Sequence, residues 1–373
     1  MDEHVSEMAD SGLTIGHVST RVVVVPLGRP VIADIGRFDQ WPLVLVDIET
    51  TNGVVGSSYI APYRQSAVRG IVAEISDLVD NVVFRGSSPI DVFDSAAKAT
   101  NVVGTAGMSR IAASALDMAL WDALAKHADL PLAVLLGGSV GPVRAYNSNG
   151  LWRHDPTTLQ AEAADLLADG GFTAVKLRLG NEHLEDDIYA ISAVRGATEA
   201  HLDLMVDFNQ ALGFGDAVRR CHELDDQGLY WFEEPIAYDN LSGYAQLARH
   251  VKTPLQLGEN HYGPRDLWNL AAAGGVHYAM GDLMRIGGVT GWLRTAGVAA
   301  AAGIQYSNHL YPEFAAHLLR VTPSAHWLEW VDWAHPILDN PVLPVDGHLT
   351  APNLAGAGLV WDEPAIRKYS VSV

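Results

Sequence analysis

The sequence predicts an α/β protein in which an N-terminal α+β module is followed by an eight-stranded parallel barrel. Short apolar runs alternate with helix-like segments from residue 143 to residue 329. Acidic residues close several of these runs, and 26 residues separate Asp207 from Glu233 and again Glu233 from Glu259. A strand, a crossover helix and two loops occupy about that length in a parallel βαβ unit. Because the sequence contains no Gly-rich dinucleotide loop, a closed barrel fits better than an open sheet.

Residues 1–138 have the pattern of the α+β module. Residues 21–26, 43–49 and 54–60 are predicted strands, and Asn52-Gly53 before the third is a strong hairpin signal. Helical periodicity follows over residues 65–78, 90–99 and 111–129. Between the first two strands we expect a loop over residues 32–40 that carries Asp34, Arg37 and Asp39. The ordinary interpretation of such charges is a solvated surface.

Residues 139–345 have the barrel pattern, and residues 346–373 are expected to return to the N-terminal module. Residues 143–147 and 174–179 are predicted strands. The helix predicted between them, over residues 157–169, has Pro156 at its start and Gly170-Gly171 at its end, as is typical of helix termini. In such a barrel the carboxyl ends of the strands meet at one mouth, so polar residues that end the strands should converge there.

The composition limits the partners and the compartment. Apolar residues make up 49% of the chain and charged residues 18%, which predicts a soluble globular protein. A net charge of −20 argues against nucleic acid or an anionic membrane as a partner. Cys221 is the single cysteine, so a reducing compartment fits. We find no signal peptide in residues 1–16 and no apolar run long enough to span a bilayer, and we expect a cytoplasmic protein.

Three carboxylates, Asp207, Glu233 and Glu259, each follow a predicted strand in the same register. One acid at such a position would more simply cap a helix, but three are hard to explain as caps. Converging at one mouth they would repel each other unless a cation neutralised them. An all-oxygen donor set suits a hard divalent ion, so the sequence predicts a Mg²⁺ site.

Further polar side chains are expected around this site. Lys176 and Arg178 lie two residues apart on one strand and so face the barrel interior, either as an ion pair with the acids or as groups for a substrate carboxylate or proton transfer. Asp282 and His309 end consecutive strands, where a carboxylate that orients an imidazole makes a general base. Glu329 ends the next strand, facing either the substrate or solvent.

The motifs AVKLRLG, VDFNQAL, WFEEP, LGENHYGP, MRIGGVTGW and SAHWLE, in this order, resemble the mandelate racemase branch of the enolase superfamily over nearly the whole chain. The resemblance implies a (β/α)7β barrel, a modified TIM barrel, under an N-terminal capping domain. It implies Mg²⁺ bound by Asp207, Glu233 and Glu259, with Lys176 neutralising a substrate carboxylate. It further implies a catalytic dyad of Asp282 and His309. Family members commonly assemble, so a homo-oligomer is implied as well.

The same resemblance assigns the remaining polar positions. Glu329 matches the electrophilic acid, which in protonated form would donate a hydrogen bond to the substrate carboxylate as negative charge develops there. Ser148 and Asn209 match polar positions around substrate and metal. The resemblance implies that the reaction is abstraction of the α-proton of a carboxylate substrate through an enediolate. Enzymes of the superfamily use a His or Lys base together with Mg²⁺ for this step.

Two departures from the family pattern affect the predicted reaction. The family's racemase has a lysine base where this chain has Arg178, and a guanidinium is a poor base. The loop over residues 32–40 is apolar in that racemase, whereas here it carries charges, and we count Arg37 as a substrate-binding candidate. Trp152-Arg153-His154 adds polar groups after the first barrel strand.

We therefore predict a Mg²⁺-dependent lyase that dehydrates a sugar acid to a 2-keto-3-deoxy acid; the sugar-acid preference is an analogy with family members. A racemase or epimerase of a 2-hydroxy acid is the main alternative. A Schiff-base aldolase using Lys176 would not need the three carboxylates. A scaffold without catalysis would need neither the acids nor the dyad.

Overall fold

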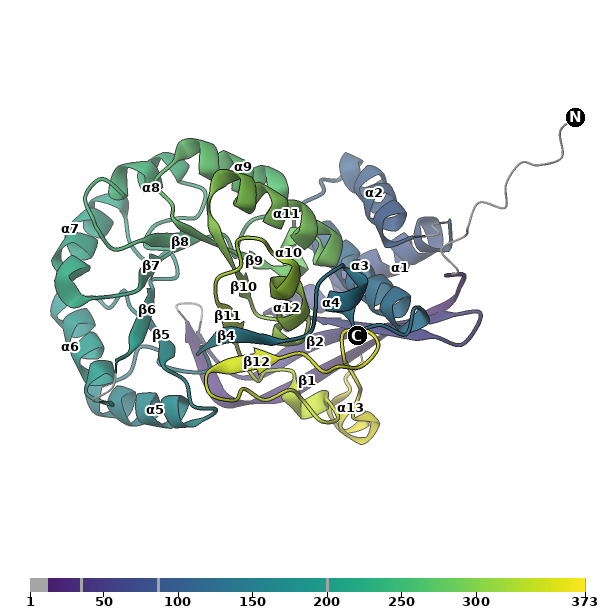
Figure 1. Cartoon of the computed structure of the whole chain (residues 1–373), viewed down its shortest axis with the longest axis horizontal. Helices are drawn as coiled ribbons and strands as arrows, with labels where there is room; N and C mark the ends of the chain where they lie inside the picture. The colour runs from purple at the N-terminus through teal and green to yellow at the C-terminus, as the bar shows by residue number, and fades with distance from the viewer. Residues whose placement is uncertain (1–12, 34–35, 86–87, 199–200, 373) are drawn as a thin grey trace, which may run out of the picture.

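The chain forms a capping domain that lies against a barrel (Figure 1), and the computed structural model describes residues 13–33, 36–85, 88–198 and 201–372. Helices surround the ring of barrel strands, and the cap with its three-stranded sheet lies to one side of that ring. This arrangement confirms the predicted fold class, a (β/α)7β barrel with an N-terminal α+β cap.

The cap sheet is antiparallel and consists of β1 (Ile15–Ala33), β2 (Gly36–Thr50) and β3 (Val55–Ile60). Gly53 has a φ of +83°, which glycine adopts without a Cβ penalty, and this explains the tight turn before β3. The loop predicted over residues 32–40 is instead mostly strand. Val31 pairs with Phe38 and Ile32 with Arg37, because β-branched and aromatic side chains extend the hairpin beyond an irregularity that follows Pro26.

In the described part of the cap, four α-helices and two short 3₁₀ helices complete the domain. Helix α3 is buried on almost every side because it packs between β3 and the barrel helices α10 (Leu283–Ile286) and α11 (Gly288–Ala302). Ser88 caps the second helix, its Oγ accepting from Asp91 N, and Pro89 occupies the first turn. The bounds are α1 (Gln65–Asn81), η1 (Val83–Arg85), α2 (Pro89–Ala99), η2 (Thr100–Val102), α3 (Met108–His127) and α4 (Leu132–Leu135).

Eight parallel strands form the barrel in the order β10-β9-β8-β7-β6-β5-β4-β11. Between β10 and β11 the Asn308 amide closes the ring, donating to Glu329 O at 3.1 Å and accepting from Glu329 N at 2.9 Å. These side-chain bonds hold Glu329 beside the end of β10. The strands are β4 (Pro142–Asn147), β5 (Ala174–Arg178), β6 (Asp203–Asp207), β7 (Trp231–Glu233), β8 (Leu255–Leu257), β9 (Tyr278–Asp282), β10 (Gln305–His309) and β11 (Leu328–Trp330).

Helical crossovers connect consecutive barrel strands and cover the outside of the ring (Figure 1). The first begins where Asp155 Oδ1 accepts from Thr157 N and Thr158 N, both at 3.1 Å. Within the described ranges, every helix falls short of the length and apolarity needed to cross a bilayer. The crossover elements are α5 (Pro156–Ala168), α6 (Leu184–Arg195), α7 (Phe214–Leu224), η3 (Asp225–Gln227), α8 (Leu241–Leu247), α9 (Pro264–Ala273), α10 (Leu283–Ile286), α11 (Gly288–Ala302), α12 (Pro312–Leu318) and η4 (Leu319–Val321).

The C-terminal segment contains η5 (His335–Ile337), β12 (His348–Thr350) and α13 (Glu363–Tyr369). Strand β12 pairs with β4 of the barrel, and the chain then reaches the cap sheet. There Arg21 Nη1 donates to Glu363 Oε1 at 2.8 Å, and Val371 N donates to Val22 O at 3.0 Å. The exact domain boundaries at residues 138 and 345 stay predictions.

Helix α3 fastens the cap to the barrel at the start of α11. Asp117 Oδ2 accepts from Thr290 N at 2.9 Å, and Trp121 Nε1 donates to Thr290 Oγ1 at 2.8 Å. With the cap held there, Val31 and Phe38 of the β1–β2 hairpin line the cavity at the barrel mouth. The hairpin therefore forms one wall of the site.

Candidate active site

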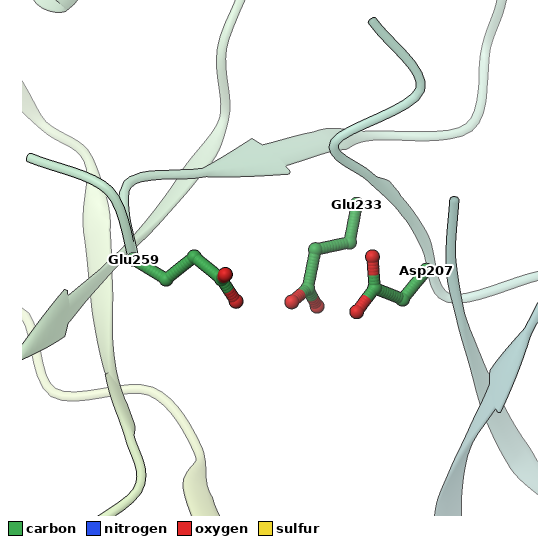
Figure 2. Close-up of side chains that lie close together, drawn as sticks. All are labelled: Asp207, Glu233 and Glu259. Atoms are coloured by element: carbon green, nitrogen blue, oxygen red, sulfur yellow. The ribbon is translucent and has the colours of Figure 1, made fainter. Parts of the chain in front are cut away.

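Asp207, Glu233 and Glu259 converge at the carboxyl ends of three neighbouring strands. Asp207 ends β6, Glu233 ends β7, and Glu259 lies two residues beyond β8. Figure 2 shows their carboxyl groups turned toward one another, and one oxygen of each lies within 4.8 Å of the others. Among the described residues, this is the one group of acids or histidines whose spacing could hold a metal ion.

The negative charges of these three acids would repel one another without a neutralising cation. Burial raises the pKa of Glu233 to about 8 and also raises the pKa of Asp207, although Lys176 opposes both shifts. Three carboxylates, of which Asp207 and Glu233 are buried, offer only hard oxygen donors, which suits the octahedral coordination of Mg²⁺ with waters and substrate oxygens in the remaining positions. These residues therefore fit magnesium.

Lys176 lies at the centre of the acids and is 1% exposed. Its Nζ is 2.9 Å from Glu233 Oε1, 2.8 Å from Glu329 Oε1 and 3.6 Å from Asp207 Oδ2. These carboxylates raise the pKa of the ammonium well above its usual value, even though burial acts to lower it. A charged Lys176 matches an anion-binding role better than a Schiff-base role, which requires a neutral amine.

Arg178 is held in one orientation by the loop after β4. Its Nη1 donates to the carbonyls of Gly150 at 2.7 Å, Ser148 at 3.2 Å and Lys176 at 3.3 Å, and its Nη2 donates to Ser148 Oγ at 2.8 Å. The guanidinium also lies 4.2 Å from the ring centroid of Trp152. These contacts use the guanidinium as a hydrogen-bond donor, and a guanidinium is a poor base, so proton abstraction by Arg178 is not expected.

Asp282 and His309 form a dyad, because β9 and β10 pair in register at these two residues. His309 Nδ1 lies 2.6 Å from Asp282 Oδ2, and His309 Nε2 lies 3.3 Å from Glu259 Oε2. Burial would lower the pKa of His309, but the carboxylates around it, Glu259 first among them, raise it to about 9. Neutralisation of Glu259 by a bound cation would remove the largest of these contributions and move the imidazole toward the range of a general base.

Glu329 is surrounded by hydrogen-bond donors and by the ammonium of Lys176. Ser148 Oγ donates to its Oε1 at 2.8 Å, and Leu310 N donates to its Oε2 at 2.9 Å. Burial would raise the pKa of Glu329, but Lys176 and His309 lower it below the ordinary value. The protonated form implied by the resemblance stays a prediction. A substrate carboxylate competing for Lys176 would weaken the ion pair and favour protonation.

The two predicted polar neighbours are both at the site. Asn209 N and Nδ2 donate to the two oxygens of Asp207, at 2.8 Å and 2.9 Å, and Ser148 links Arg178 to Glu329. Both residues line the central cavity. Asn209 has a φ of +45°, a left-handed conformation that turns its side chain back toward Asp207.

The central cavity has a volume of about 170 Å³ and an apolar upper wall that the sequence did not predict. Arg37 lies outside it: its Nη2 pairs with Asp39 at 2.8 Å, and both side chains are more than half exposed. Residues 37 and 39 share one face of β2, so Phe38 between them faces the cavity. A contact of Arg37 with substrate thus stays a prediction, and Asp34 lies outside the described residues. The wall consists of Val31, Phe38, Trp41, Tyr63, Trp152, Leu310, Val331 and Trp333.

Together, the capped barrel and the groups at its mouth define an enzyme of the enolase superfamily. Comparison with known families supports this: residues 17–137 match the N-terminal domain of mandelate racemase and muconate lactonizing enzyme, and residues 158–365 match the enolase C-terminal domain-like family. The chain belongs to the mandelate racemase/muconate lactonizing enzyme family of that superfamily, as the sequence motifs predicted.

Several relatives are similar over nearly their whole length. L-talarate/galactarate dehydratase of Salmonella typhimurium is 30% identical over 96% of this chain and 92% of its own. An enolase of alpha proteobacterium bal199, solved with bound magnesium, is 48% identical with a TM-score of 0.94, covering 96% of this chain and 100% of its own. An enolase of Bradyrhizobium, complexed with magnesium and mandelic acid, is 39% identical with a TM-score of 0.92, covering 96% and 99%.

Proposed function

We propose that this protein is a Mg²⁺-dependent lyase that dehydrates a sugar acid to a 2-keto-3-deoxy acid. The observation that carries the proposal is an asymmetry between two strands at the barrel mouth. His309 and Asp282 supply a base on β10, while β5 presents Arg178, a guanidinium held by backbone carbonyls and an aromatic ring. A single base suits removal of one α-proton followed by loss of a β-hydroxyl. The likeness to L-talarate/galactarate dehydratase adds support at the level of reaction class.

The residues have distinct roles in this reaction. Asp207, Glu233 and Glu259 would hold the magnesium ion, which as a Lewis acid stabilises charge on the substrate carboxylate. Lys176 binds the same carboxylate as a fixed cation, so charge stabilisation is present before the proton moves. His309 Nε2 takes the proton from C2, and Asp282 keeps the imidazole oriented through Nδ1.

Loss of the hydroxyl completes the balance of atoms. The proton on His309 passes to the departing hydroxyl at C3, so water leaves and a C2–C3 enol remains, which tautomerises to the 2-keto acid. Arg178 binds and orients the substrate as a hydrogen-bond donor and does not transfer a proton. Its Nε is buried with no hydrogen-bond partner among the described residues, and its side chain lines the cavity, so a substrate oxygen can satisfy this donor.

The Arg178→Lys variant tests this role. An ammonium cannot reproduce the fork that contacts three carbonyls and Ser148, so we expect kcat/KM for the best sugar acid to fall about 10–100-fold, as loss of one or two charged hydrogen bonds predicts. Steady-state kinetics measures this. Arg195→Lys is the matched control, since Arg195 Nη2 also donates to backbone carbonyls but far from the mouth. Unchanged kinetics in the Arg178 variant would contradict the assignment.

Racemisation of a 2-hydroxy acid is the second candidate, and the apolar wall that includes Trp41 and Phe38 favours it. A screen of C4–C6 sugar acids for 2-keto acid product, with mandelate racemisation followed by polarimetry in parallel, distinguishes the two reactions. We expect keto acid from at least one sugar acid and slower turnover of mandelate. Mandelate racemisation at a rate rivalling every sugar acid would instead make the protein a racemase.

A further inference from the structure

Glu234 is a buried carboxylate directly after the ligand Glu233 that has no part in the mechanism above. It is 1% exposed and lines a second cavity of about 220 Å³, which shares Arg178, Asn209 and Glu259 with the central one. Its φ is +39°, a left-handed conformation that costs a non-glycine residue about 1–3 kcal/mol. A regular strand would turn consecutive side chains to opposite faces, so the left-handed backbone is what lets Glu234 face the mouth as Glu233 does.

Glu234 joins the segments that follow the three ligand-bearing strands. Gln210, three residues after Asp207, donates from Nε2 to Glu234 Oε2 at 2.8 Å and from its backbone N to Glu234 O at 2.7 Å. Asn260, directly after Glu259, donates from Nδ2 to both Glu234 oxygens, at 2.9 Å and 3.1 Å. The Glu234 carboxylate therefore links the loop beyond Asp207 to the loop beyond Glu259 through its hydrogen bonds with Gln210 and Asn260, and we call this set of bonds the tie.

We propose that Glu234 is a positioning residue that sets the spacing of Asp207, Glu233 and Glu259 and so determines the affinity of the site for Mg²⁺. It is outside the group of three acids whose oxygens lie within 4.8 Å of one another, and the amides of Gln210 and Asn260 occupy both its oxygens. Three converging acids repel each other, so without this tie their loops would relax apart before a cation arrives. Residues that orient metal ligands in this way commonly contribute 10–100-fold to affinity.

Metal affinity is measured on the full chain without substrate, by calorimetric titration with Mg²⁺ and by the electron paramagnetic resonance spectrum of bound Mn²⁺. We expect Glu234→Gln and Gln210→Ala each to raise the Mg²⁺ Kd by about 10–100-fold and to broaden or shift the Mn²⁺ signal. Gln210→Ala matters most, because it keeps every carboxylate and removes just two side-chain hydrogen bonds, the one to Glu234 and the one that Gln210 Oε1 accepts from Tyr238 N. It also remains informative if Glu234→Gln fails to fold.

Two matched controls show whether a change in Kd is specific to the bonds between Glu234, Gln210 and Asn260. Glu185→Gln removes an exposed carboxylate from the first turn of α6, and Gln160→Ala removes a side-chain bond to Gly196 O on the outside of the barrel. Both should leave Kd within twofold of the wild type. Weakening by Glu234→Gln alone would mean that its charge, not its contacts, matters, and this would overturn the proposal, as would no effect of either variant. No substrate is used, so failure of the sugar-acid assignment would leave this result unaffected.

Discussion

Replacing His309 with asparagine should lower kcat by about 10²–10⁴-fold, the usual loss when a general base is removed. Asparagine can still meet Asp282 with its amide, so the end of β10 should keep its conformation. The Mg²⁺ Kd should not rise, because His309 is not among the three acids that could hold the ion and loss of a cationic imidazole 3.3 Å from Glu259 favours a cation there. Steady-state kinetics and calorimetry on the same preparation separate these two effects, and His250→Asn, an exposed histidine after α8, serves as the control.

Isotope exchange gives the same prediction a stereochemical test. In D₂O the wild-type enzyme should exchange the α-proton of only one configuration at C2, because His309 approaches from one side and Arg178 keeps its protons. Proton NMR of both C2 epimers of the best substrate measures this directly. Equal exchange from both epimers with no keto acid formed would reveal a second base, and the racemase assignment would then replace the dehydratase.

Changing Glu233 to glutamine should abolish Mg²⁺ binding and turnover while the barrel stays folded. The loss should exceed the 10–100-fold expected from residues that only orient ligands, because one of three ligand charges is removed. The fold should survive because glutamine has the length and shape of the side chain it replaces, and burial opposes the charge that the change removes. Lys176 would keep Glu329 at 2.8 Å as a partner.

Calorimetry and thermal unfolding monitored by circular dichroism measure these two outcomes. Glu223→Gln, at an exposed position of α7, controls for the loss of a carboxylate elsewhere. In the wild type, exhaustive chelation should likewise stop turnover, and addition of Mg²⁺ should restore it. Full activity after chelation would refute a metal-dependent reaction.

Much of the site could be predicted from the sequence because barrel topology converts spacing into proximity. Strand ends recur once per βα unit, so the 26-residue intervals between Asp207, Glu233 and Glu259 bring all three to one mouth. The same rule placed Asp282 beside His309, since parallel neighbours align their ends in register. The turn at Asn52-Gly53 was also predictable, because local backbone preference decides it.

Tertiary structure alone decided which side chains line the cavity and how their pKa values are shifted. Phe38 rather than Arg37 lines the cavity because the β1–β2 pairing extends through both residues and sets which face turns inward. Glu234 was missed since strand alternation would turn it away from the mouth, and only its left-handed backbone reverses this. Lys176, which lies 2.8 Å from Glu329, lowers the pKa of that carboxylate against the effect of burial. Local sequence determines where strands end, whereas register, backbone strain and burial depend on contacts between residues far apart in the chain.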